Sequence, residues 1–377
     1  MSDKKILPYT ARAISNLDQK INTAKTLSER HIFFAQKAFT LARHSQIPNA
    51  REIIRELRRL NSNYQDPKLS AWIMFAEGVI EYSDSMNIAK SKDRILRAHL
   101  VGQVVNEPTL AGTSAAWLGQ FIFLEEKVAE ACGYLTKAFE WTTPDDNEAR
   151  SRAGMVFGLA FYMSGDFERA KFWMQKARNH AVASGDIAMQ NIILYNTAAL
   201  LTSQLMLMDC ASKVDPDDLR FAVMSAQSAA NLNAALGISN QPRMVPVQRA
   251  ELFTIERRWA EAVALFDDNI DPTDTYGQAK WAANFYAQRA WCKANLGDFE
   301  GCRSDLNLAI SDPNQSSDVD DMAILHFRVA GCARLMSDDA LLEFHQAMAK
   351  KYLEKFQAHQ ALIRELIAPL ADSLAKK

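Results

Sequence analysis

Few residues of this sequence have types and spacings that could perform catalysis. The seven histidines and five cysteines are dispersed, without the spacing of a zinc site, and nucleotide-binding glycine motifs, HExxH and G-x-S-x-G are absent. His326 and His345 fall on adjacent predicted helices and could meet, which is the one basis for an enzyme hypothesis. Cys132, Cys302 and Cys332 fall on predicted packing faces, as structural thiols do. The sequence therefore predicts a protein that is not an enzyme and that uses no cofactor or metal.

The charged residues favour solvated helix faces over a nucleic-acid site. The chain carries 43 Lys/Arg and 45 Asp/Glu, a net charge of −2, although residues 1–105 hold 17 basic against 10 acidic residues. The segment REIIRELRRL places Arg51 and Arg55 on one helix face, and Glu52 and Glu56 on another. Interleaved charges at this spacing are typical of ion pairs along an exposed helix. We therefore predict no nucleic-acid partner.

The elements that position these residues are predicted to be helices. Apolar residues recur at spacings of three and four, with almost no alternation of the kind that marks strands. Only 14 Gly and 11 Pro occur in 377 residues, so turns are few. No window is apolar enough for a transmembrane helix, and the first thirty residues lack the apolar core of a signal peptide. These features predict an all-α protein of the reducing cytoplasm with no membrane partner.

Two segments of the chain share one pattern, which indicates an internal repeat. The first reads SRAGMVFGLAFYMSGDFERAKFWMQKARNHAVASGD, and the second reads QRAWCKANLGDFEGCRSDLNLAI. Each contains a Gly-Asp-Phe turn, at Gly165 and at Gly297, and Gly158 and Ala170 are small where two antiparallel helices would meet. Aligning these two units with weaker copies places repeat starts near residues 31, 71, 112, 151, 191, 243, 283 and 323. The one longer step, of 52 residues, predicts an insertion near residues 209–220.

These patterns resemble the tetratricopeptide repeat (TPR) family, whose signature is a W/L-x-x-L-G-x-x-Y/F helix, a short turn and an A-x-x-x-F/Y-x-x-A helix. The resemblance covers roughly residues 31–345, and its period of about 40 is similar to that of longer-helix bacterial arrays. It implies a right-handed α-α superhelix of about eight helix pairs. We expect an N-terminal capping helix in residues 1–30, the repeat array in 31–338, and one long helix in 339–377.

The resemblance also implies where a partner binds, because first helices line the concave groove of such a superhelix. Proteins with these repeats bind segments of other proteins there, so we predict a non-enzymatic scaffold or adaptor. Amide side chains suit this role since they donate and accept hydrogen bonds at once, and aromatic rings supply apolar anchors. The register turns eight residues toward the groove: Gln120, Arg152, Tyr162, Asn196, Gln248, Glu251, Gln288 and Trp291.

The C-terminal helix leaves several roles open. Its apolar residues from Leu341 to Leu374 form a stripe that either caps the last repeat or pairs two chains in a homodimer. A third role belongs to the alternative function, in which the groove senses a small peptide or metabolite and the C-terminal helix transmits the signal.

Overall fold

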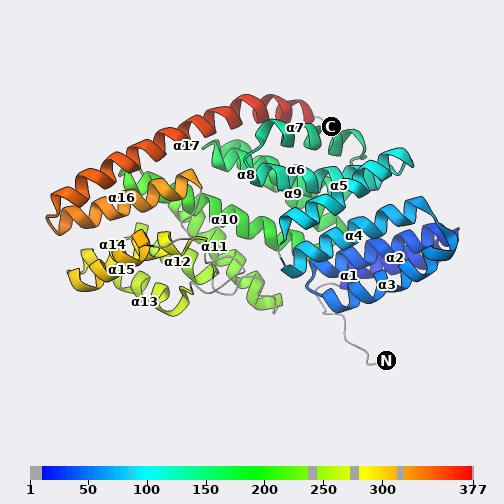
Figure 1. Ribbon diagram of the computed structural model, residues 1–377, viewed down its shortest axis with the longest axis horizontal. Helices are drawn as coiled ribbons and strands as arrows, with labels where there is room; N and C mark the ends of the chain where they lie inside the picture. The colour runs from blue at the N-terminus through cyan, green and yellow to red at the C-terminus, as the bar shows by residue number, and fades with distance from the viewer. Residues whose placement is uncertain (1–10, 86, 237–243, 272–279, 312–317, 376–377) are drawn as a thin grey trace. The chain divides into compact units, whose positions relative to one another are not determined.

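The computed structural model describes residues 11–85, 87–236, 244–271, 280–311 and 318–375 (Figure 1). Within these residues the chain forms seventeen α-helices and no strand, so the all-α prediction is confirmed. The chain divides into two compact units. The first contains the described residues of Met1–Phe161, Asp166–Ile193 and Ile363–Lys377, and the second those of Tyr162–Gly165 and Leu194–Leu362.

The helices are divided between the two units. Those belonging wholly to the first unit are α1 (Ala11–Thr23), α2 (Leu27–Arg43), α3 (Ile47–Tyr64), α4 (Pro67–Ser85), α5 (Ile88–Val104), α6 (Pro108–Leu124), α7 (Val128–Glu140) and α9 (Phe167–Ser184). Those belonging wholly to the second are α11 (Pro216–Leu236), α12 (Met244–Ile255), α13 (Trp259–Asn269), α14 (Ala282–Asn295), α15 (Phe299–Ser311) and α16 (Val319–Leu335). Three helices supply residues to both units: α8 (Asn147–Met163), α10 (Ile187–Cys210) and α17 (Asp339–Leu374).

Consecutive helices pack as pairs within each unit. In the first unit α2 packs on α3, α4 on α5 and α6 on α7, while in the second α12 packs on α13 and α14 on α15 (Figure 1). The first helix of a pair also contacts the first helix of the next, as α2 contacts α4 and α14 contacts α16. This arrangement is consistent with a helical repeat, as the sequence period indicates.

Close packing of a pair depends on small residues at the contact, as the segment from Ser151 predicts. A β-carbon on Gly158 of α8 would lie 2.7 Å from Cγ of Met174 on α9, closer than carbon atoms approach without displacing each other. Ala170 and Phe161 are fully buried beside this contact. The ring centroids of Phe157 and Trp173 lie 4.6 Å apart across the same pair. Glycine at position 158 therefore sets how closely α8 and α9 approach.

The turn within a helix pair has the same backbone form in several pairs. A residue with left-handed backbone follows the first helix. The N–H of the residue after it donates to the carbonyl oxygen of the residue five positions earlier than the donor. Thus Asp166 N donates to Phe161 O at 2.9 Å, and Asp298 N to Lys293 O at 3.0 Å. The left-handed residues at these turns are Ser45, Glu126, Gly165, Ser212, Arg257, Gly297 and Ser337. These helix pairs thus share one turn geometry, and glycine occupies the left-handed position at the two sites that the Gly-Asp-Phe pattern indicates.

Two glycine-to-alanine substitutions should have opposite effects on stability. Gly297 has φ +82 and no neighbour near its missing side chain, so Gly297→Ala is expected to cost about 1 kcal/mol through backbone strain alone. Gly133 is an exposed position inside α7 with equally open space, so Gly133→Ala should instead add about 0.5–1 kcal/mol. Urea unfolding of the full chain checks both values. Shifts of the same sign would contradict the assignment of Gly297 to a left-handed turn.

No helix in the described ranges combines the length and apolar character that crossing a membrane requires.

Candidate functional site

Polar side chains gather on the first helices of the second unit. We call this group the polar cluster: Asp209 of α10, Gln248 and Glu251 of α12, Asn284, Gln288 and Trp291 of α14, and Arg328 of α16. Helix α12 packs against α14, and α14 against α16. Gln248, Gln288 and Arg328 follow one another at intervals of 40 residues, which is one period of the predicted repeat. The repeat register therefore brings polar residues of successive pairs to one face.

Arg328 holds several of these helices together. Its Nε donates to Oε1 of Gln288 at 2.8 Å, and its Nη2 donates to Oδ2 of Asp209 at 2.7 Å. Arg328 and Asp209 are only 4% and 5% exposed, so the ion pair is shielded from water. Asp209 also pairs with Nη2 of Arg257 at 2.7 Å, at the turn between α12 and α13. One buried carboxylate thus balances the buried guanidinium and links α10, α12, α14 and α16.

Several buried polar atoms of the cluster have no hydrogen-bond partner among the described residues. Gln248 is 5% exposed, and neither its amide oxygen nor its amide nitrogen is bonded. Asn284 is 7% exposed with an unbonded Oδ1, and Nε1 of Trp291 is also unbonded. Each such group costs about 1–3 kcal/mol when it is buried without a partner. The cluster therefore offers both donors and acceptors to a ligand that reaches it.

Glu251 is the acidic member of the cluster that lacks a basic partner. Its half-buried side chain makes no hydrogen bond or ion pair within the described part of the chain. Burial raises the pKa of Glu251 to about 8, and the opposing effect of Arg328 is too small to prevent this. Glu251 in turn adds to the effect of burial in raising the pKa of Tyr195 on α10. At neutral pH the carboxyl group is therefore mostly protonated until a cation approaches it.

The eight residues that the sequence predicts to line a groove differ in how deeply their side chains are buried. Gln120, Arg152, Tyr162, Gln248 and Gln288 are buried, whereas Asn196, Glu251 and Trp291 are half-buried. In the first unit, Nη1 of Arg152 donates to Oε1 of Gln120, and its guanidinium lies 3.5 Å from the ring centroid of Trp117. Burial lowers the pKa of Arg152 to about 10. Gln120 thus accepts from Arg152 within the first unit, although Nε of Arg152 has no hydrogen-bond partner among the described residues, and polar atoms of Gln248 and Trp291 also lack one.

Three members of the polar cluster were not among the predicted groove residues: Asp209, Asn284 and Arg328. The repeat register contains the signal for Arg328, because Arg328 follows Gln288 by one period. Asn284 precedes Gln288 by one helical turn and so shares its face. No comparable signal marks Asp209, since it is the first residue of the predicted insertion at 209–220, where the register is interrupted.

The first unit contains a separate buried ionic group. Arg43 of α2 pairs with Glu148 of α8 and with Asp186, which lies just before α10. Although burial acts to raise the pKa of Asp186, Arg43 and His44 hold it well below its usual range. Both carboxylate oxygens of Asp186 have partners within the unit, so this carboxylate is already engaged by the protein itself.

His326 and His345 meet, as the sequence indicates, with their Nδ1 atoms 2.7 Å apart. The ring of His326 also stacks on the ring of Tyr352, with the two ring centroids 5.5 Å apart. Burial lowers the pKa of both histidines, that of His326 to about 4, so both rings are neutral at physiological pH. In the described residues no group of three or more His, Cys, Asp or Glu side chains is placed to hold a metal ion. The pair thus fills the contact between α16 and α17.

Searches against models of known protein families and against curated protein sequences find no match to this chain.

Proposed function

We propose that this protein is a non-enzymatic, TPR-like repeat protein of the cytoplasm that binds a segment of another protein at the polar cluster. The fold would be the right-handed superhelix that the family resemblance implies. The observation that carries the proposal is the set of buried, unbonded polar atoms on Gln248, Asn284 and Trp291. A peptide backbone presents an N–H and a C=O at each residue, so it can satisfy both atoms of the Gln248 amide. The five free cysteines suit a reducing compartment.

Glu251 adds a charge preference to the proposed site. Gln248 and Glu251 lie three residues apart on α12 and therefore on one face. The carboxyl group has no basic partner among the described residues, so a lysine or arginine of the bound segment would supply one. The proposed partner segment therefore combines exposed backbone with a basic side chain.

A display library of short peptides, selected on the full chain, tests the proposal. Selected peptides carrying Lys or Arg should bind the wild-type chain in isothermal titration. Gln248→Met keeps the side-chain length but removes both hydrogen-bonding groups, so affinity should fall about tenfold or more. Folding should not suffer from Gln248→Met, because this change removes unbonded buried atoms and leaves no new ones.

The matched control is Gln227→Met, since Gln227 is an exposed amide of α11 that donates to Oδ1 of Asn231. Its affinity should equal that of the wild-type chain. Equal affinities for all three chains would refute the site, and a library that yields no binding peptide would refute the proposed function.

A further inference from the structure

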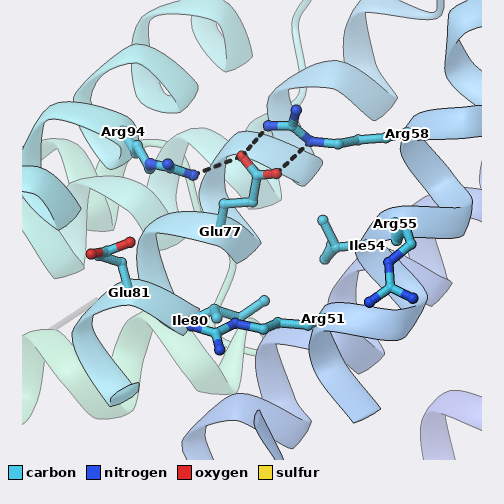
Figure 2. Close-up of a pocket in the computed structure, with 8 residues that line it drawn as sticks. All are labelled: Arg51, Ile54, Arg55, Arg58, Glu77, Ile80, Glu81 and Arg94. Carbon is cyan, nitrogen blue, oxygen red and sulfur yellow. Dashed lines mark hydrogen bonds and ion pairs between the residues drawn. The ribbon is translucent and has the colours of Figure 1, made fainter. Parts of the chain in front are cut away.

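A pocket of about 340 Å³ opens on the first unit between α3, α4 and α5 (Figure 2). Four arginines line it, Arg51, Arg55 and Arg58 from α3 and Arg94 from α5. Two glutamates from α4, Glu77 and Glu81, complete its charged lining. This pocket lies outside the polar cluster, since α3, α4 and α5 all belong to the first unit.

The spacing of α3 explains why its arginines reach one pocket. Residues 51, 55 and 58 recur every three to four positions, which places their side chains on one helix face. Ile54 of the same helix is 5% exposed and Ile80 of α4 is also buried, so the pocket has an apolar base. Long arginine side chains extend over this base and carry their charges to its rim.

Glu77 fixes two of the guanidinium groups. Nε and Nη2 of Arg58 donate to its two carboxylate oxygens at 2.5 and 2.7 Å, and Nη1 of Arg94 donates at 2.9 Å (Figure 2). Glu77 is half-buried, with a side chain 13% exposed. Its charge is thereby neutralised, while Nη1 of Arg58, with two N–H groups, bonds to no acceptor in the part of the chain that the structure describes. The ion pairs thus pre-position donors that a ligand would otherwise have to order.

The remaining charges leave the pocket basic. Glu81 pairs with Lys90 at 3.0 Å, and Arg51 pairs with Asp84 in an exposed contact. Such an exposed pair stabilises little, so Arg51 can turn to another anion at small cost. Arg55 is exposed and has no acidic partner among the described residues. Four arginines against two glutamates give the lining a net charge of +2.

We propose that this pocket binds a phosphate monoester dianion, whose charge matches that excess. Arginine forks pair with phosphate oxygens bidentately, and four arginines line this one pocket. The apolar base at Ile54 and Ile80 would contact the carbon part of the ester. A long polyanion fits poorly, because the exposed Glu52 and Glu56 place negative charges beside the basic face of α3. The phosphoryl group would belong to a small metabolite or to a phosphorylated side chain.

Titration calorimetry of the full chain at low salt tests this site with three probes. Inorganic phosphate, adenosine monophosphate and a short phosphoserine peptide each carry the dianion; adenosine and the unmodified peptide lack it. The proposal requires binding by the phosphate-bearing probes and none by their controls. Tighter binding of the nucleotide would indicate a metabolite, and tighter binding of the peptide a phosphorylated protein.

Two arginine variants separate a defined site from general charge attraction. Arg55→Gln removes the uncommitted guanidinium and should weaken binding about tenfold or more. Arg59→Gln makes the same charge change at a side chain that is 75% exposed, pairs with Glu56 and does not line the pocket, so it should have little effect. Equal weakening by both variants, or no binding of any phosphate-bearing probe, would overturn the proposal.

Discussion

Replacing Asp209 by asparagine is expected to lower the free energy of unfolding of the second unit by about 3–5 kcal/mol. The reason is the buried pair with Arg328, whose two side chains are each less than 5% exposed. Asparagine keeps the shape of the side chain but removes its charge, so the Arg328 guanidinium would remain buried without a counter-ion. Hydrogen exchange of the full chain, read on peptides of α16, measures the loss within the second unit.

Two further variants define what the Asp209 result means. Asp217→Asn changes the same group on α11, where the carboxylate is 85% exposed and pairs with Arg220, so it should cost less than about 0.5 kcal/mol. Arg328→Met, added to Asp209→Asn, removes both buried charges and should recover much of the stability that the single change loses. A double variant no more stable than Asp209→Asn alone would contradict an electrostatic origin of the loss.

The sequence predicts the local parts of this fold because they depend on near neighbours. Helix formation follows from apolar residues three and four positions apart, and the turns at Gly165 and Gly297 from the left-handed backbone that glycine permits. Prolines mark helix starts for the same reason, as Pro67 and Pro108 open α4 and α6. These features need no information from distant parts of the chain.

The site could be predicted only in part, because its contacts are distant in sequence. Asp209 and Arg328 are 119 residues apart, and the longer step in the repeat period separates their registers. The register predicts which face of a helix carries Gln288 or Gln120, but it does not predict how deeply that face is covered. Depth depends on which helices pack over it, so the sequence did not reveal that both amide oxygens accept from buried arginines.

The affinity of the chain for a basic peptide is expected to rise with pH up to about 8 and then to level off. This prediction depends on the proposed peptide site. Because burial raises the pKa of Glu251 to about 8, the carboxyl group holds a proton at lower pH and must release it to pair with a cation. Binding then releases one proton, so affinity should fall by up to about tenfold for each pH unit below 8. A lysine in the peptide stays charged throughout this range.

Glu251→Gln should bind more weakly at pH 8 and show no such pH dependence, whereas Glu300→Gln, at an exposed position of α15, should keep the wild-type profile. Titration calorimetry at pH 6, 7 and 8 in buffers of different ionisation enthalpy measures both the affinity and the released proton.

The free energy of unfolding gives a second measurement, made on the chain without peptide. Since the folded pKa of Glu251 lies above its ordinary value of 4.5, the folded chain binds more protons between these values. The wild-type chain should therefore lose stability as pH rises through this window, and Glu251→Gln should lose less. If the wild-type affinity does not change from pH 6 to 8 while the stability difference remains, then Glu251 titrates but does not take part in peptide binding.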